Sequence, residues 1–453
     1  MQSWWFETAL LTQGWAGHVR VTAESGRIVS VTPDAEPDVR DERHKVAVPG
    51  IANLHSHAFQ RGMAGMAERR GPEADSFWTW RDLMYRFANA IGPDELEAIA
   101  ALAFVEMLET GFVRTGEFHY VHHDRDGTPF ANPAEMGARL AAAARETGIA
   151  LTLLPVLYMT AGFGGVPPKP EQRRFVHDPD SYVRLIEASR EAVTVLEDAR
   201  IGVAPHSLRA VTPDGLRAAL AIGAGGPVHI HVAEQTGEVE DCLRHSGRRP
   251  VEWLLANAPV DAHWCLVHAT HVTAAELSAI VRSRAVVGLC PITEANLGDG
   301  IFPAAELFAA GGGFGIGSDS NVLIDLAQEL RSLEYSQRLR HRARNLLSNA
   351  ACPSSGRALF DAARRGGGQA LGVEGASLAP GARADFVTFD SAHPTLAGRS
   401  GDALLDAFVF ADSRDMIDGV WCGGRQWVRN GRHVAREAVV RRYSRALAGL
   451  AIA

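Results

Sequence analysis

In the stretch KVAVPGIANLHSHAFQRG, residues 45–62, a short apolar run ends at His55 and His57. On an extended chain, side chains two residues apart point to the same face. Both imidazoles can therefore face one ion at the end of a buried strand. The HxH pair alone is a weak motif, because two histidines hydrogen-bonded within a core would give the same pattern.

Seven further short apolar runs follow, and longer amphipathic segments such as residues 94–111 and 213–226 separate them. Near-continuous apolar runs fit strands that are buried on both faces, and strand–helix alternation predicts a parallel sheet. Eight such units predict an α/β fold of the (β/α)₈ TIM-like barrel type. The predicted strand endings are residues 45–55, 114–120, 150–158, 199–207, 227–234, 263–270, 285–293 and 312–320.

The two chain ends predict a second, smaller unit. Residues 17–34 alternate apolar and polar positions around a turn at residues 24–26, and residues 384–390, 406–412 and 416–434 also read as strands. Asn430-Gly431 is a strong signal for a type I′ hairpin turn. Because neither end has enough strands for a stable sheet alone, we expect residues 1–48 and 375–453 to form one small β-sandwich domain. Residues 49–374 would then form the barrel.

Composition narrows the class of protein. The 453-residue chain is 46% hydrophobic and 22% charged, with a formal net charge of -8, so no basic surface for nucleic acid is expected. No apolar run reaches the roughly 18 residues of a membrane span, and the first residues lack the pattern of a signal peptide. Five scattered cysteines without a CxxC pair favour reduced thiols and a cytoplasmic protein.

Polar residues gather at the predicted strand ends, where a (β/α)₈ barrel carries its active site. His231 and Asp319 could join the HxH pair as third and fourth ligands, although spacing alone does not separate His231 from His229. Imidazole and carboxylate suit zinc, which in a catalytic site keeps a position for water. The chain has no HExxH helix and no PCxxC motif. Further polar groups at strand ends are Glu117, His119, Tyr120, His206, Glu234 and His268.

Five segments resemble the amidohydrolase superfamily: PGIANLHSH (49–57), HIHVAEQ (229–235), LVHATH (266–271), GIGSDS (315–320) and LAPGARADFVTFD (378–390). The chain is most similar to the branch of mononuclear deaminases. This resemblance implies one Zn²⁺, or another divalent metal, and it favours His231 over His229. It also implies that Asp319 accepts a proton from water, Glu234 shuttles a proton and His268 polarises the electrophile. The implied metal ligands are His55, His57, His231 and Asp319.

Within that branch the chain resembles the formimidoylglutamate deiminase family of histidine degradation, in HAFQRGMAG, FWTWRDLMY, GEFHYVHHD, PHSLRAV and HIHVAEQTGEVEDC. The resemblance implies zinc-dependent hydrolysis of N-formimino-L-glutamate to N-formyl-L-glutamate and ammonia. Family members are often dimers, so a homodimer is expected. The implied substrate-binding residues are Gln60, Arg81, Tyr120, His206 and Arg209.

The charge of this substrate fits those residues. N-formimino-L-glutamate carries two carboxylates, so a net acidic protein needs local cations, and arginine grips carboxylate in a bidentate way. Arg209 lies just past the fourth predicted strand, and Arg81 lies in the insertion after the first. Arg86 competes with Arg81 for the second carboxylate. His122 and His123 are assigned no role.

Three alternatives stay open from the sequence. One is another deaminase of this branch, acting on a purine, a pterin or an S-adenosylhomocysteine-like substrate, for which aromatic walls would be expected instead of two arginines. A second is the ring-opening imidazolone hydrolase of the same pathway, whose substrate motifs are not found here. The third is a metal-free binding protein on the same frame, although such proteins usually lose metal ligands and this chain keeps all four.

Overall fold

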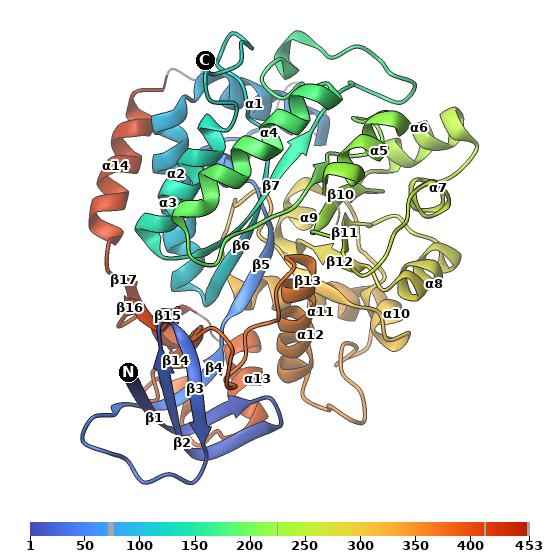
Figure 1. Ribbon diagram of the computed structural model, residues 1–453. Coiled ribbons are helices and arrows are strands. Elements are labelled where there is room, and N and C mark those ends of the chain that lie inside the picture. Colours follow the sequence, from blue (N-terminus) through green and yellow to red (C-terminus); the bar gives the residue numbers. More distant parts are fainter. Residues whose placement is uncertain (71–76, 224, 412–413, 451–453) are drawn as a thin grey trace.

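The computed structural model describes residues 1–70, 77–223, 225–411 and 414–450, and it contains two β units (Figure 1). A ring of parallel strands lies inside a layer of helices. Beside one end of this ring lies a sheet that combines strands from the start and the end of the chain.

The ring is built from two hydrogen-bonded arcs of parallel strands, β5-β6-β7-β8 with β9 also on β7, and β10-β11-β12-β13. Isolated bridges join the arcs at both seams, Ser56 to Asp319 and Val203 to Val228. The predicted TIM-like barrel is thereby confirmed, with its fourth strand broken into two short pieces around Gly202. The bounds are β5 Ile51–Ser56, β6 Phe112–His119, β7 Ala150–Leu157, β8 Arg200–Ile201, β9 Ala204–Pro205, β10 Val228–Val232, β11 Trp264–His268, β12 Val286–Leu289 and β13 Phe314–Ile316.

Local sequence signals explain where helices begin. Pro93 occupies the first turn of α2, and the backbone N–H of Gly92 donates to the Glu95 carboxylate at 2.8 Å.

Within the described ranges, no helix combines the length and apolarity needed to cross a bilayer. The helices are α1 Phe77–Ala90, α2 Pro93–Glu109, α3 Glu135–Thr147, α4 Pro179–Ala192, α5 Pro213–Ile222, α6 Thr236–Ser246, α7 Pro250–Asn257, α8 Ala274–Ser283, α9 Pro291–Leu297, α10 Ala304–Ala309, α11 Leu326–His341, α12 Ser355–Ala370, α13 Asp402–Phe410 and α14 Arg436–Ala448. Short 3₁₀ turns are η1 Ala58–Met63, η2 Pro170–Gln172, η3 Val193–Val195, η4 Pro394–Leu396 and η5 Arg414–Met416.

The terminal sheet has the strand order β17-β16-β15-β14-β4-β1-β2-β3. Both chain ends therefore build one β unit, as predicted. Aromatic rings from the two ends share its core: the Phe386 ring lies 5.1 Å from Trp4 and 4.7 Å from Trp421. The predicted turn at Asn430 and Gly431 has φ values of 50° and 70°. The strands are β1 Gln2–Leu11, β2 Gly14–Glu24, β3 Arg27–Thr32, β4 Glu42–Pro49, β14 Phe386–Phe389, β15 Ile417–Cys422, β16 Arg425–Arg429 and β17 Arg432–His433.

One predicted strand is wrong. Residues 406–412 were expected to be extended, but residues up to Phe410 belong to helix α13, while Asp412 lies outside the described part of the chain. The helix begins at Asp402, and its buried residues include Leu404 and Leu405 as well as Phe408. This spacing of three to four residues is that of a helix face, and a window starting at residue 406 misses its first turn.

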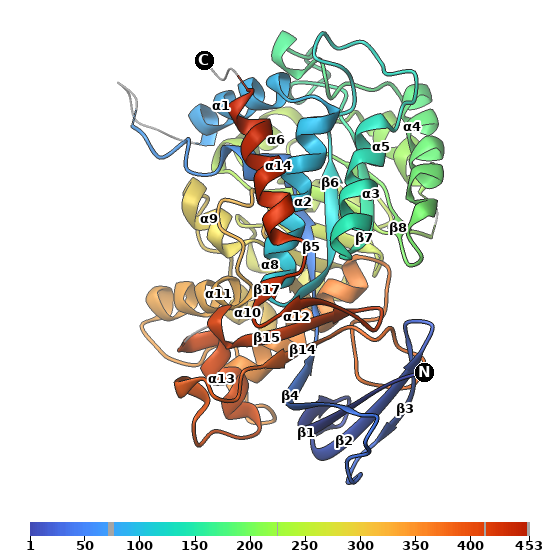
Figure 2. The same cartoon turned by 90° about the vertical axis from the view of Figure 1, so that its left-hand side faces the viewer.

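Helix α14 carries the chain end back onto the barrel, where it lies alongside α2 (Figure 2). Arg436 pairs with Glu109 at the end of α2, and Arg442 pairs with Glu146 on α3. These ion pairs and the buried Val439 fix the C-terminal segment to the outside of the barrel.

Candidate active site

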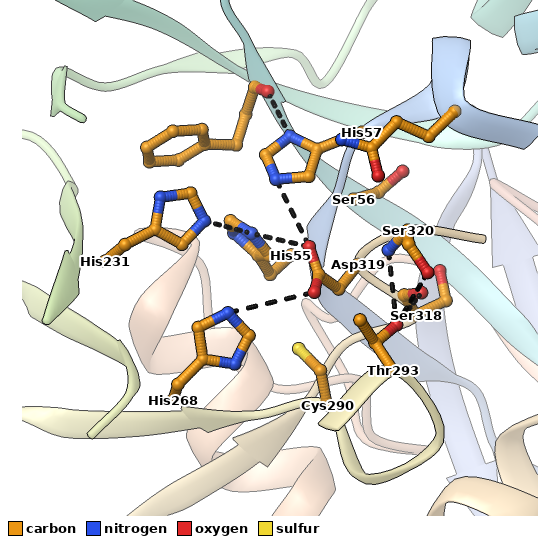
Figure 3. A network of polar contacts seen from close by, with 12 residues as sticks. His55, Ser56, His57, His231, His268, Cys290, Thr293, Ser318, Asp319 and Ser320 are labelled. Carbon is orange, nitrogen blue, oxygen red and sulfur yellow. Dashed lines mark hydrogen bonds and ion pairs between the residues drawn. The ribbon is translucent and has the colours of Figure 1, made fainter. Parts of the chain in front are cut away.

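Four side chains converge where barrel strands end (Figure 3). His55 lies on β5 and His57 directly follows it, His231 lies on β10, and Asp319 follows β13. Their ligand atoms all lie within 4.8 Å of one another, and all four residues are buried. The Asp319 Oδ1 atom is 3.4 Å from His55 Nε2 and 3.2 Å from His57 Nε2, and His55 Nε2 is 3.0 Å from His231 Nε2.

Backbone carbonyls orient two of these imidazoles. The Nδ1 atom of His57 lies 2.8 Å from the Phe118 carbonyl, and that of His231 lies 3.2 Å from the His206 carbonyl. Because a carbonyl only accepts, each Nδ1 carries the proton, which leaves the Nε2 lone pair of His57 and of His231 available to a metal ion. Three imidazoles and one carboxylate form a donor set that suits a divalent zinc-like ion.

Neighbouring His229 takes no part in this cluster. Its Nε2 atom lies 2.7 Å from the Ala370 carbonyl, at the end of helix α12. The expectation that His231 is the member that joins the HxH pair therefore agrees with the geometry, although both histidines are buried on the same strand.

The closing seam of the barrel holds the cluster together. The N–H of His57 donates to the Asp319 carbonyl, and the N–H of Asp319 donates to the His55 carbonyl, both at 2.9 Å. The Asn321 side-chain amide donates to Ser56 Oγ at 3.1 Å and to the His57 carbonyl at 3.0 Å. The first and last barrel strands thus bring their ligands to one place.

Backbone strain marks the same strand ends. Ala233, His268 and Asp319 have φ values of 52°, 65° and 43°, a region that residues other than glycine rarely occupy. Such conformations cost on the order of 1–3 kcal/mol each and persist where the surrounding structure enforces them. Here they turn the chain at the ends of β10, β11 and β13, where polar side chains are needed.

Three further titratable side chains, His268, Glu234 and Glu294, lie beside the cluster. The His268 Nε2 atom is 3.9 Å from Glu234 Oε1 and 3.8 Å from Asp319 Oδ2, and its Nδ1 atom is 3.3 Å from Glu294 Oε1. Burial acts to lower the pKa of His268, but these carboxylates raise it to about 10. Burial raises the pKa of Glu234, with His268 acting against it.

Two of the clustered imidazoles and the Asp319 carboxylate are held in forms that can bind a metal ion. Burial lowers the pKa of His55 to about 3 and that of His231 well below its ordinary value. Burial acts to raise the pKa of Asp319, but the adjacent side chains of His55 and His57 hold it well below the usual range. Neutral imidazoles and an ionised carboxylate are the forms that bind metal.

A cavity of about 50 Å³ opens in front of these groups. Every site residue named from the sequence lines it except His55, whose Nε2 atom lies 3.4 Å from Asp319 Oδ1. The lining residues named from the sequence are His57, Gln60, Arg81, Tyr120, His206, Arg209, His231, Glu234, His268 and Asp319.

Two arginines supply the positive charge of the cavity. Arg209 is only 9% exposed, and no ion pair joins Arg209 or Arg81 to a carboxylate anywhere in the described ranges. The Arg81 guanidinium carbon lies 4.4 Å from the Trp78 ring centroid. Burial lowers the pKa of Arg81, and the charge of Arg209 adds to this effect. Arg86 is exposed and lines a different hollow, so Arg81 is the arginine that faces the cavity.

The structure also shows lining residues that sequence reasoning missed. Tyr85 and Tyr158 lie in the cavity wall, together with Phe77, Trp80, Met84, Phe175 and Leu297. Tyr158 directly follows β7, so its place at a predicted strand end was a usable signal. Glu294, which contacts His268, belongs to none of the motifs quoted above.

Three of the polar residues left without a role, Glu117, His122 and His123, make structural contacts. Glu117 accepts the backbone N–H of Ala58 at 2.6 Å. His122 and His123 hydrogen-bond the carbonyls of Val156 and Val176 at 3.0 and 2.8 Å. These two histidines hold the segment after β6 against strand β7 and against the connection that follows β7.

Comparison with known proteins gives consistent matches along the chain. The amidohydrolase family model matches residues 46–427, and the model described as formimidoylglutamate deiminase HutF, N-terminal domain, matches residues 5–45. The formimidoylglutamate deiminase of Pseudomonas aeruginosa is 50% identical over 446 residues, 98% of each chain. An amidohydrolase structure from Brucella melitensis has a TM-score of 0.96 and 52% identity over 99% of each chain. A zinc-bound adenosine deaminase structure from Xanthomonas campestris shares the fold, with a TM-score of 0.80 and 22% identity over 98% of this chain and 97% of its own.

Proposed function

We infer that this chain, which belongs to the amidohydrolase family, is a formimidoylglutamate deiminase that hydrolyses a C–N bond of N-formimino-L-glutamate. The full-length identity to such an enzyme supports this conclusion. The observation that carries it structurally is the cavity itself. The buried metal-ligating groups lie at its base, and two arginines without a carboxylate partner in the described ranges lie in its wall.

We propose that His55, His57, His231 and Asp319 hold one Zn²⁺. When bound, this ion would lower the pKa of a water molecule to about 7 and polarise the carbon that is attacked. Two of the imidazoles are already oriented by carbonyls, so little reorganisation is needed on binding.

The chain's own residues then move the protons. Asp319, ionised and 3.8 Å from His268, accepts a proton from the attacking water. Glu234 carries a proton to the terminal nitrogen, and His268 stabilises the charge that develops on the reacting centre. A C–O bond forms, the bond from carbon to the terminal nitrogen breaks, and the products are N-formyl-L-glutamate and ammonia.

The remaining lining groups position the substrate. Arg81 and Arg209 bind its carboxylates. The Gln60 amide nitrogen donates to the Tyr120 hydroxyl at 2.7 Å, while its Oε1 atom is buried without a partner in the described part of the chain. That oxygen is suited to accept an N–H of the formimino group. His206 lies between Tyr120 and Tyr158 and completes this wall.

Aromatic rings line the cavity as well, so wall composition alone does not separate a dianion from a flat ring. The two arginines do distinguish a dianionic substrate from a flat ring. A neutral purine or pterin would leave two largely buried guanidinium groups without an ion-pair partner in the described ranges, which is costly. A dicarboxylate substrate would give each guanidinium group a carboxylate partner and so remove this cost.

The test is the Glu234→Gln variant, compared with the native enzyme at equal metal content. The native enzyme should convert N-formimino-L-glutamate to equal amounts of ammonia and N-formyl-L-glutamate. The variant should keep its zinc and lose most of its turnover, by a factor of about 10²–10⁴. Near-normal turnover in the variant would remove Glu234 from the mechanism, and absence of product with the native enzyme would refute the function.

A further inference from the structure

We propose that Tyr85 and Tyr158 are a pair of neutral hydrogen-bond donors for a substrate carboxylate, and that Gln172 is the positioning residue that frees their hydroxyl protons for the cavity. The proposal rests on the proposed function, because it assigns the contacts of a dicarboxylate substrate. All three residues are nearly inaccessible: Tyr85 is 5%, Tyr158 2% and Gln172 1% exposed.

The orientation of the Gln172 side-chain amide is fixed by the backbone N–H of Lys169. The N–H of Lys169 donates to Gln172 Oε1 at 2.8 Å, and only an oxygen can accept this proton. The Nε2 atom therefore faces the other way. It donates one proton to the Tyr158 hydroxyl at 2.7 Å and one to the Tyr85 hydroxyl at 3.0 Å.

Each tyrosine hydroxyl accepts from Gln172, so its own proton must point elsewhere. The hydroxyls of Tyr158 and Tyr85 interact with each other, and no further protein acceptor for their two protons is found in the described ranges. Both side chains line the active-site cavity. A buried donor without an acceptor is unfavourable, and a carboxylate entering the cavity would supply acceptors for both protons.

The two tyrosines also lie next to both arginines. The Arg81 guanidinium carbon is 5.5 Å from the Tyr85 ring centroid. The Thr160 hydroxyl, two residues past Tyr158, donates to the Arg209 carbonyl at 3.0 Å. The segments that carry Tyr158 and Arg209 are thus tied together, so the charged and the neutral donors can act on one carboxylate group.

Neutral donors add something that further arginines would not. Tyr85 and Tyr158 bring directional O–H groups without adding positive charge to the repulsion between Arg81 and Arg209. The segment holding Gln172 comes from the long connection after β7, far in sequence from Arg81. The arrangement predicts that the affinity for a dicarboxylate depends on the Gln172 amide, although this amide makes no contact with the dicarboxylate.

The first experiment measures binding of glutarate, a five-carbon dicarboxylate without a formimino group, by calorimetry on the metal-loaded enzyme. Tyr85→Phe and Tyr158→Phe should each weaken glutarate binding by about ten- to a hundredfold, the usual value for a hydrogen bond to a charged group. KM for N-formimino-L-glutamate should rise in parallel and change more than kcat. Tyr182→Phe is the matched control, because its buried hydroxyl donates to the Pro155 carbonyl outside the cavity.

The second experiment tests the role of Gln172. Gln172→Glu keeps an oxygen for the Lys169 N–H but turns the other atom into an acceptor, so both tyrosine protons should rotate away from the cavity. We expect glutarate affinity to fall at least as far as in either tyrosine variant. Gln337→Glu is the control, since that buried glutamine has a comparable pattern, with its amide donating to the Phe302 carbonyl and its oxygen accepting the Ala305 N–H.

A third variant separates positioning from folding. Gln172→Met should weaken glutarate binding in the native background and have no further effect in a Tyr85→Phe, Tyr158→Phe background, because the amide acts through the hydroxyls. An equal loss in both backgrounds, or glutarate affinities within about twofold of native for both tyrosine variants, would overturn the proposal. Failure of the proposed function looks different: the native enzyme would release no ammonia, whatever the variants bind.

Discussion

Replacing Arg209 by methionine would remove a buried guanidinium group while keeping most of the side chain's volume. Truncating one member of a buried charge pair costs about 2–5 kcal/mol. Because Arg209 keeps 9% of its surface exposed, water can reach the released carboxylate, and the lower half of that range applies. About 2–3 kcal/mol corresponds to a rise in KM of about 30- to 150-fold.

The stability of this variant should change little. Burial acts to lower the pKa of Arg209, but Tyr158, Glu238 and Glu234 raise it, so the protein partly compensates the charge and its removal should leave the melting temperature nearly unchanged. Arg114→Met is the matched control: Arg114 is 4% exposed at the opposite end of the barrel and pairs with Asp198. It should lower the melting temperature and leave KM unchanged. Steady-state ammonia release and thermal melting of both variants decide the matter, and a KM for Arg209→Met within about threefold of native would refute the reasoning.

Three further predictions concern the rest of the site. Arg81→Met should raise KM at least about tenfold, whereas Arg86→Met should not, as steady-state kinetics on the two variants will show. Removing the metal with a chelator should abolish ammonia release and lower the melting temperature, and adding zinc should restore both; full activity without metal would contradict the proposed ligand set. Glu238 accepts the N–H groups of Ala233 and Glu234, and burial raises its pKa from 4.5 to about 7. An acid with a raised folded-state pKa stabilises the fold at low pH, and this contribution is lost as pH rises through about 7. Glu238→Gln should therefore gain stability relative to native between pH 5 and pH 8, by up to about 3 kcal/mol, in thermal melts at the two pH values.

The barrel could be predicted because buried parallel strands leave a simple trace. Each strand is a short apolar run, and the ends of most of them are marked by a polar residue that reaches the site, as with His55 on β5 and His268 on β11. The alternation of His55 and His57 places both side chains on one face, and the polar residues at the other strand ends turn this weak signal into a predicted site. What the sequence could not supply was the closure of the ring, which depends on the bridge between Ser56 and Asp319, residues from the first and the last unit of the barrel.

Elements whose identity depends on tertiary contacts were missed or misassigned. Strand β1 was not predicted, although Trp4 and Phe6 alternate toward the core, because its identity depends on pairing with β2 and β4. The short apolar run in α13 fits a strand as well as a helix until its first turn is included. Gln172 gives no sequence signal, because its role depends on two hydroxyls from α1 and the end of β7.

The decisive assay is ammonia release by the zinc-loaded protein from N-formimino-L-glutamate, with guanine and S-adenosylhomocysteine as parallel substrates. Release from N-formimino-L-glutamate alone is the predicted result, and it would support both the hydrolytic chemistry and the dicarboxylate pocket. Release from guanine or S-adenosylhomocysteine instead would leave the metal cluster and Glu234 in place, but it would contradict the roles given to Arg81 and Arg209.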